Sequence, residues 1–453
     1  MNVSFYVRPW SYKYFEYIGE CLGEQYDFSL VSDFKGLCKN DLSTSFYSVI
    51  NNPEKLDKID ISHVDNGKVI LQDRLLRSLP YEDAVILIKA AQYSILDYFE
   101  NNEIDAFISV TIDSYIIDLI ELNCKNLNIP FMGIHLTMIS GYTLVTSRGE
   151  INELRSVQDK ELNDVYERIT SSNYSVNYVK EKNPPFELAF KRWVRSLIKI
   201  PYFELFRRYK NDRLNYHYLA TIAVSKSRSS IVFLNYRKYF CNSWASHISK
   251  NLKKIYIPLQ FHPECNSEYW SNVSIFLPYE EGLLDVVEIL NKKYQIIIKE
   301  HPEMIGLRNP MFYKNLQSMG NVIIVPVGVS QEKLLDECDV SATWNSSIGI
   351  ESILRGKRVI TFAEPLYVVG NIYLNIDAKV DMLEKIDKFI NTEHQITLEE
   401  KKNVIRKVLS TSFVGHPDEC FFDPLNKNKM ENANSVLKSL KDLLPTWLSS
   451  YND

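Results

Sequence analysis

Short apolar runs alternate with longer segments of helical period along most of this chain. Runs such as residues 106–110 and 295–299 are too short for buried helices. Each is followed by a segment with apolar residues at three- and four-residue steps. This order is typical of βα units that feed a largely parallel sheet, so the sequence predicts an α/β fold.

The expected elements form two groups separated by a charge-rich stretch. The first group has predicted strands and helices at residues 3–7, 12–22, 84–99, 106–110, 115–126 and 129–134. From about residue 150 to residue 213 the strand pattern gives way to charged, helical sequence interrupted by prolines. The second group has alternating elements at residues 255–261, 282–290, 295–299, 311–319, 322–325, 332–337, 340–343, 347–354 and 359–362.

These two groups predict two Rossmann-like domains that face a central cleft. A chain of 453 residues also exceeds what one hydrophobic core usually organises. We expect an N-terminal domain at residues 1–250 with a helical insertion at about 150–215, and a C-terminal domain at 251–410. A helical tail at 411–453 is expected to cross back to the first domain. Open α/β sheets bind ligands at the carboxyl ends of their strands, which places the chemistry between the domains.

Composition excludes several classes of protein. A net charge of -5 gives no overall attraction to nucleic acid, so no nucleic-acid partner is expected. The seven cysteines are scattered and never form a CxxC pair, which argues against a disulfide framework or a structural zinc site. No window holds 18 uninterrupted apolar residues, and the first residues lack the order of a signal peptide. A cytoplasmic location is the expectation.

The stretch Lys299, Glu300, His301 and Pro302 comes directly after the apolar run 295–298. Pro302 disfavours helix at His301, so the imidazole is expected to be held at the edge of the sheet. There it could bind a phosphate oxygen as the cation, or donate a proton to a departing phosphate. A loop histidine bound only by backbone is the structural alternative.

A second stretch, Asn345, Ser346 and Ser347, lies between a predicted strand and a predicted helix. The first amides of that helix and the two hydroxyls would form an anion site favoured by the helix dipole. Plain helix capping is the alternative interpretation. Glu351 lies about one turn further on and is expected near a ribose hydroxyl, with a surface carboxylate as its alternative.

Two further strand ends contribute polar or aromatic residues to the same edge of the sheet. His262 and Glu264 follow the strand 255–261, and Tyr367 follows the strand 359–362. We expect His262 and Glu264 to be catalytic, and Tyr367 to stack on a base or sugar unless it is buried. In the first half, His135 is expected to face the cleft and contact an acceptor, or to be an ordinary loop histidine.

Three motifs carry a resemblance to a known family: PLQFHPE, IIIKEHPEM and NSSIGIESILRGKRVITFAEPLY. They are similar to those of bacterial capsule-polysaccharide biosynthesis glycosyltransferases, relatives of the retaining β-Kdo transferases. The resemblance covers residues 255–367, and it departs from the family at Gln260, where a histidine is more usual. It implies the GT-B architecture of two Rossmann-like domains and a nucleotide-sugar donor.

The resemblance also implies roles for individual residues. His301 and the Ser346–Ser347 pair would hold the single phosphate of a CMP-sugar without a metal or other cofactor, and Glu351 would approach the ribose. Further residues are expected to bind the donor nucleotide beside them: Lys299, Glu300, Pro302, Asn345 and Tyr367. An acidic residue of the N-terminal domain acts as nucleophile in the β-Kdo transferases, and Asp113 has the best position for that role here. The expected function is transfer of Kdo or a related ulosonic acid to a glycan of capsule, O-antigen or lipopolysaccharide.

Two alternatives stay open: a GT-B transferase that uses a UDP- or GDP-sugar, and a noncatalytic polysaccharide-binding or export-assembly protein. A further interpretation concerns residues 190–213, in which aromatic and aliphatic residues are interleaved with lysines and arginines. This segment is expected to contact the anionic inner face of the cytoplasmic membrane, where lipid-linked acceptors lie. A solvated charged helix face is the competing interpretation.

Overall fold

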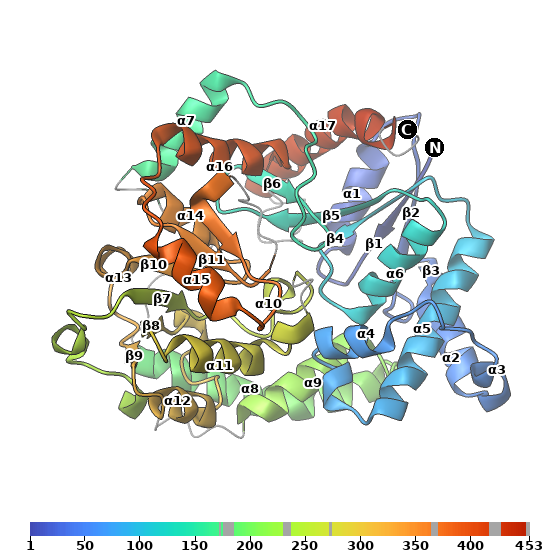
Figure 1. Ribbon diagram of the computed structural model, residues 1–453. Helices are drawn as coiled ribbons and strands as arrows, with labels where there is room; N and C mark the ends of the chain where they lie inside the picture. The colour runs from blue at the N-terminus through green and yellow to red at the C-terminus, as the bar shows by residue number, and fades with distance from the viewer. Residues whose placement is uncertain are drawn as a thin grey trace.

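The computed structural model describes residues 1–171, 174, 185–229, 237–270, 274–363, 370–415 and 427–449. Within them the chain forms two sheets flanked by helices (Figure 1). The first sheet has the order β13-β6-β5-β4-β1-β2-β3. The second has the order β12-β11-β10-β7-β8-β9, and these neighbouring strands all pair in parallel. The expected α/β class with two Rossmann-like units is confirmed.

The first sheet is parallel from β5 to β3 and antiparallel where β6 meets β5 and β13. Its strands are β1 (Asn2–Tyr6), β2 (Asp27–Ser32), β3 (Asn40–Asp41), β4 (Ala106–Val110), β5 (Phe131–Leu136), β6 (Tyr142–Val145) and β13 (Ser412–Val414). The accompanying helices are α1 (Tyr12–Cys21), α2 (Leu42–Ile50), α3 (Pro53–Asp57), α4 (Asn66–Gln72), α5 (Tyr81–Asn101) and α6 (Tyr115–Asn126).

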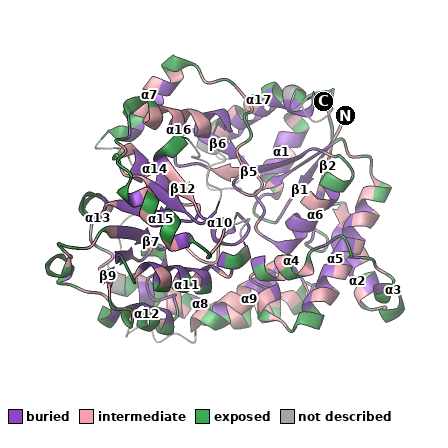
Figure 2. Cartoon of the chain, viewed as in Figure 1, coloured by how far each residue is buried: buried purple, intermediate pink, exposed green. Residues whose placement is uncertain are grey.

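The second sheet comprises β7 (Lys254–Pro258), β8 (Gln295–Lys299), β9 (Val322–Val325), β10 (Val340–Thr343), β11 (Val359–Thr361) and β12 (Tyr373–Asn375). Its helices are α10 (Cys265–Glu268), α11 (Tyr279–Leu290), α12 (Pro310–Gln317), α13 (Gln331–Glu337), α14 (Ser347–Leu354) and α15 (Met382–Asn391). Helices cover both faces of this sheet, so its strands are apolar without alternation. In β8, Ile296, Ile297 and Ile298 all have 0% exposure. Figure 2 shows the same burial along both sheets.

The remaining helices connect the two units. In Figure 1, α8 (Pro185–Tyr209) and α9 (Tyr216–Ser229) run below both sheets, and α7 (Asp159–Thr170), α16 (Leu398–Ser410) and α17 (Lys427–Ser449) lie above them. α7 and α16 share one apolar cluster with α14. β13 then returns the chain to the first sheet beside β6, and α17 packs against β13 and α1.

Short α10 belongs to the second half of the chain but packs on the first unit. Glu268 is buried at 0% exposure and accepts hydrogen bonds from Arg74 and Arg77. Tyr269 donates to Asp73 at 2.5 Å, and the Trp270 indole N–H donates to the Thr111 hydroxyl at 2.8 Å. Because a buried carboxylate is stable only with such partners, this contact fixes the two units relative to one another.

Each sheet reverses its strand order at one place, which is where open α/β sheets bind ligands. In the first sheet β1 has β2 on one side and β4 on the other, so the reversal lies at the carboxyl ends of β1 and β4. In the second sheet it lies at the carboxyl ends of β7 and β10. The turns after these four strands contain Arg8, Asp113, Gln260 and Ser346.

Candidate functional site

Three adjoining cavities lie between the two units, and Phe261 lines all of them. The Ser346 cavity, of about 490 Å³, is lined by Ser346, Ser347 and His301 of the second unit and His135 of the first. The Asp113 cavity, of about 300 Å³, shares His135 with it and reaches Asp113. A third, the basic cavity, extends from Asp113 to α8 and α9. Together they form one cleft lined from both sheets.

The start of α14 forms one wall of the Ser346 cavity. Ser346 is the N-cap, and its hydroxyl accepts from the Ile348 amide at 3.3 Å. Asn345 donates its side-chain N–H to the Trp270 carbonyl at 2.7 Å, which ties the helix start to α10. The partial positive charge of a helix N-terminus therefore faces a cavity, an arrangement that favours an anionic ligand such as a phosphate.

His301 lines the same cavity from the turn after β8. Its Nδ1 accepts from the Glu303 amide at 3.1 Å, so the proton of the neutral ring lies on Nε2. Burial, assisted by Arg308, Arg192 and Lys299, lowers the pKa of His301 to about 4 in the absence of ligand, although Glu300 opposes this shift. With this pKa the imidazole is neutral near pH 7, so it offers the Nε2–H as a hydrogen-bond donor, in contrast to the cation that was one of its two expected roles.

Two buried amide side chains on this cavity have unused hydrogen-bonding groups. Gln260 is only 4% exposed, and neither its side-chain nitrogen nor its side-chain oxygen has a hydrogen-bond partner among the residues that the structure describes. The side-chain oxygen of Asn266 is also buried without a partner. Both residues line the Ser346 cavity. Because an unpaired buried polar group is costly, these amides indicate that a polar ligand completes the cavity.

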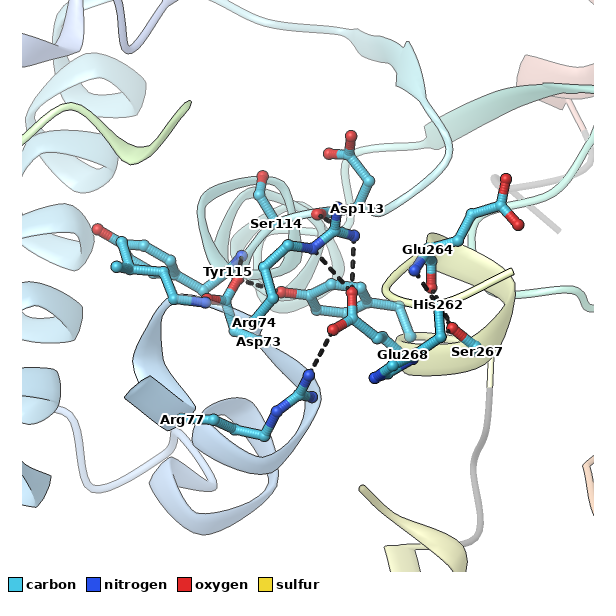
Figure 3. Close-up of polar contacts among 12 residues, drawn as sticks. Asp73, Arg74, Arg77, Asp113, Ser114, Tyr115, His262, Glu264, Ser267 and Glu268 are labelled. Carbon is cyan, nitrogen blue, oxygen red and sulfur yellow. Dashed lines mark hydrogen bonds and ion pairs between the residues drawn. The ribbon is translucent and has the colours of Figure 1, made fainter. Parts of the chain in front are cut away.

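Glu264 lines both the Ser346 cavity and the Asp113 cavity. Its backbone amide donates to the Ser267 hydroxyl at 3.2 Å at the start of α10, and Figure 3 shows its carboxylate pointing away from that helix. Burial raises the pKa of Glu264 to about 7, against the opposing effect of Arg74. A carboxyl group with this pKa exchanges protons readily near neutral pH, as a general acid or base must.

Asp113 follows β4 and lies on the Asp113 cavity. Arg8 binds both of its carboxylate oxygens, at 2.8 and 2.9 Å, while the Asp113 side chain stays 30% exposed. Burial alone would raise its pKa, but the Arg8 guanidinium holds the pKa of Asp113 below its ordinary value. Of the two carboxyl groups on the Asp113 cavity, Asp113 thus has a lowered pKa and Glu264 a pKa raised to about 7, a separation that favours different roles for them.

His135 lies between the two carboxylates, on the walls of both cavities. Its ring meets the Trp270 ring edge-on with centroids 4.9 Å apart. Burial lowers the pKa of His135 to about 4, with Asp113 opposing the shift. The imidazole is therefore neutral and offers hydrogen bonds to a hydroxyl-rich ligand.

His262 does not take the expected place. It is absent from the lining of all three cavities. Its Nδ1 is 3.0 Å from the Ser267 hydroxyl, and its ring packs on Tyr279 with centroids 5.4 Å apart. Burial together with nearby arginines lowers the pKa of His262 well below its ordinary value. We correct its assignment from catalytic to structural, because β7 already ends at Pro258 and the following turn directs His262 toward α11.

Glu300 is also structural. It is 1% exposed, and its carboxylate accepts from the Arg308 guanidinium at 2.7 Å and from the Tyr313 hydroxyl at 2.5 Å. Arg308 in turn donates to the Gln260 carbonyl at 2.8 Å. Successive residues after a strand point to opposite faces, so Glu300 supports the turns from below while His301 faces the cavity.

Three other residues expected at the donor are not among the residues that line the three cavities: Lys299, Pro302 and Glu351. The Pro302 carbonyl accepts from Arg192 of α8 at 3.0 Å. The Glu351 carboxylate accepts from the Gln331 side chain at 2.7 Å and faces α13. Burial raises the pKa of Glu351 to about 7, against the effects of Arg355 and Lys299. Tyr367 lies outside the described residues.

Sequence reasoning missed the arginines of the cleft and the role of Gln260. Arg8 directly follows Val7 at the end of the first apolar run, so the rule that selected His301 would have selected it too. Arg74 and Arg228 carry no local pattern that marks them, since they reach the cleft from a turn and from a helix surface. Within the described ranges there is no group of three or more metal-ligating side chains. No helix in those ranges is long and apolar enough to cross a membrane.

Two Rossmann-like units that face one cleft, with the start of α14 on its wall, define an α/β protein with the two-domain architecture of the GT-B type. Residues 167–373 match the sequence model of a family described as "Capsule polysaccharide biosynthesis protein". The match includes α8, α9 and most of the second sheet, and it confirms the resemblance to capsule polysaccharide biosynthesis proteins. A search of curated proteins gives no match.

Solved structures with related topology share little sequence with this chain. Thermosulfurimonas dismutans KpsC, a beta Kdo 2,7 transferase, is 13% identical over 77% of this chain and 89% of its own, with a TM-score of 0.33. UDP-GlcNAc 2-epimerase from Neisseria meningitidis is 13% identical over 90% of this chain and 99% of its own, with a TM-score of 0.26. Similarity at this level carries no weight for the substrate or mechanism of this chain.

Proposed function

We propose that this protein is a glycosyltransferase of capsule polysaccharide biosynthesis that takes a sugar from a nucleotide donor. The observation that carries the proposal is that His301 and the Ser346–Ser347 helix start line one cavity between the two sheets. A neutral N–H donor and helix amides stabilise the negative charge that develops on a departing phosphate. The match to the capsule family supports the biological setting.

The donor that best fits this arrangement is a CMP-sugar, with Kdo or a related ulosonic acid as the sugar. A single phosphate needs fewer cationic partners than a diphosphate, and the described walls of the Ser346 cavity include no lysine or arginine. The unpaired amides of Gln260 and Asn266 supply both donors and acceptors for a base or a sugar. Neither feature calls for a metal ion.

The two carboxylates divide the chemistry of transfer. In the first step an Asp113 oxygen attacks the anomeric carbon, the bond from that carbon to the phosphate oxygen breaks, and the phosphate leaves toward His301 and α14. In the second step the acceptor hydroxyl attacks the same carbon, its proton passes to Glu264, and the Asp113 carboxylate is released. The opposite pKa shifts of Asp113 and Glu264 support this division.

The acceptor is a glycan that approaches from the first unit, past His135. A lipid-linked acceptor fits the surface of α8, which exposes large apolar side chains beside lysines and arginines: Phe190, Leu197, Ile198, Tyr202, Leu205 and Tyr209. We propose that this ridge rests on an anionic membrane. The I198E/L205E variant should no longer float with phosphatidylglycerol vesicles, whereas the control V380E, at another exposed apolar residue, should float as the wild type does.

A panel of nucleotides tests the function. CMP should raise the melting temperature more than UDP or GDP, because a ligand that binds only the folded state stabilises it. Stabilisation by UDP or GDP but not by CMP would show that the donor is a UDP- or GDP-sugar instead. The proposal that the protein is a glycosyltransferase would stand. Incubation with CMP-Kdo should then release CMP and give a covalent sugar adduct, detected by intact mass in E264Q. Glycan binding without turnover of any donor would favour a noncatalytic binding protein.

A further inference from the structure

The basic cavity gathers more positive charge than its neighbouring residues neutralise. Six basic side chains line it: Arg8, Arg74, Arg192, Arg195, Lys199 and Arg228. Among the described residues, two acidic side chains line it, Asp113 and Glu303. The basic residues come from the turn after β1, from the segment before η1 (Leu76–Ser78), and from α8 and α9. Elements far apart in the sequence therefore direct like charges into one space.

Three of these cations have carboxylate partners and three do not. Arg8 pairs with Asp113, Arg74 with Glu268, and Arg192 with Glu303. Among the described residues, no carboxylate forms an ion pair with Arg195, Lys199 or Arg228. Arg228 instead donates to the His262 carbonyl at 3.3 Å and lies over the Phe261 ring, 5.7 Å from its centroid.

The pKa shifts of two of these side chains, Arg228 and Lys199, agree with their lack of a carboxylate partner among the described residues. Burial, with Arg74 and Arg192 close by, lowers the pKa of Arg228 to about 10. Burial and then the neighbouring Arg195 and Arg228 lower the pKa of Lys199. Both charged forms are thus disfavoured in the ligand-free protein, and a bound anion would remove this cost. Lysines and arginines on a helix surface are normally solvated by water. Their concentration in this cavity therefore favours the binding of an anionic ligand.

The cavity has the size and surface for a sugar that carries an anionic group. Its volume is about 430 Å³, and Trp10 on its wall is 37% exposed, with the Arg8 guanidinium 5.5 Å from the centroid of its ring. The basic cavity shares Arg8, Asp113 and Phe261 with the Asp113 cavity. A sugar whose anionic group is held in the basic cavity can therefore place a hydroxyl group near the Asp113 and Glu264 carboxylates.

We infer that the basic cavity binds a phosphate or carboxylate group of the acceptor, through Arg195, Lys199 and Arg228. The identification of the ligand as the acceptor rests on the proposed function, whereas binding of an anion does not. This site is separate from the phosphate site at α14, since none of these three residues lines the Ser346 cavity. The protein therefore has two anion sites, one for each substrate.

Calorimetry with inorganic phosphate, in protein already saturated with CMP, tests the second site directly. The wild type should bind phosphate, and the R195Q/K199Q/R228Q variant should lose at least about tenfold in affinity, because charge-assisted hydrogen bonds are lost. The control K191Q/R208Q/K210Q removes three charges from exposed positions in α8 and directly after it that do not line the cavity, and it should bind phosphate as the wild type does. R195Q and K199Q singly provide milder variants, and stabilisation by CMP reports folding.

The outcomes separate this inference from the proposed function. Equal phosphate affinity in the wild type and the triple variant, or no phosphate binding at all, overturns the inference even if CMP stabilises the protein. Phosphate binding that depends on the three residues, without stabilisation by any nucleotide, supports the anion site and removes the transferase proposal. Titration with glycerol 1-phosphate and with glucuronate then distinguishes a lipid-linked phosphate from an acidic sugar, and weaker binding of both in the triple variant supports the site.

Discussion

The two strand-order reversals that face each other across the cleft have the same topology and opposite electrostatics. The reversal in the second sheet presents mainly uncharged groups: a helix start, a neutral His301 and the amide of Gln260, beside the Glu264 carboxyl, whose pKa is raised to about 7. The reversal in the first sheet is ionic, with the Arg8–Asp113 pair. The difference indicates that a parallel sheet determines where a ligand binds, while the turn residues determine which chemistry is available there.

The ionic side is expected to give the largest effect. D113N should lower the transfer rate at least about a thousandfold, because an amide cannot form the glycosyl ester. Stabilisation by CMP should persist, since Asp113 does not line the Ser346 cavity. Steady-state rates and nucleotide-induced melting shifts measure the two quantities. If D113N still transfers the sugar at the wild-type rate, Asp113 is not the nucleophile and serves only as the structural ion-pair partner of Arg8.

The neutral side should give the next largest effect. H301A removes one N–H donor to the departing phosphate and should lower kcat about a hundredfold, with weaker binding of CMP. H247A, at an exposed histidine of the same unit, is the matched control and should leave both unchanged. If H301A reduces only stability and leaves CMP binding intact, the imidazole belongs to the fold rather than to the ligand site.

Glu264 connects the two sides, and its pKa near 7 gives a pH-dependent test. As a general base it acts in the ionised form, so kcat/KM should rise with pH through about 7, and E264Q should lose this rise. Folding raises the pKa of Glu264, so this residue contributes a loss of stability as pH increases from 4.5 to about 7. E264Q should therefore lose less stability over this range than the wild type, while the similar contribution of Glu351 remains in both proteins. A pH profile that is the same in E264Q would exclude this role.

The smallest effect concerns two buried glutamines. Q260L should leave stability unchanged or raise it by about 1 kcal/mol, because it removes an unpaired buried amide, while weakening binding of CMP. Q295L is the matched control: Gln295 is also buried, but its side chain bonds to the Ser249 amide and the His247 carbonyl, so its loss should destabilise by about 1 kcal/mol. Equal effects in denaturant unfolding would show that Gln260 serves the fold.

The same contrast explains what the sequence could predict. β8 and β10 and the helix α14 were predicted with their observed bounds, because short apolar runs buried on both faces and a serine N-cap are local features. The sequence does not predict the helices and strands from β2 to α4, because the short helices and the half-buried strand of this region give only weak periodicity.

The site was predictable in position more than in detail. Ser346, Ser347, His301, Glu264, His135 and Asp113 all line the cleft, as proximity to strand ends indicated. His262 and Glu300 meet the same positional criterion and are structural, because the direction of a side chain in a turn depends on distant partners such as Tyr279 and Arg308. The basic cavity depends on the packing of α8 and α9 against both units, which no local pattern encodes.

The buried contact of Glu268 with Arg74 and Arg77 has a consequence for how substrates come and go. If the two units moved far apart, the buried Glu268 carboxylate would lose its ion pairs with Arg74 and Arg77. Removal of the partners of a buried charge costs several kcal/mol. A hinge motion that opens the cleft is therefore disfavoured. We expect donor and acceptor to enter through the openings of a cleft that is already formed before they bind. Coordinates obtained with and without nucleotide should accordingly superimpose, with adjustments restricted to side chains.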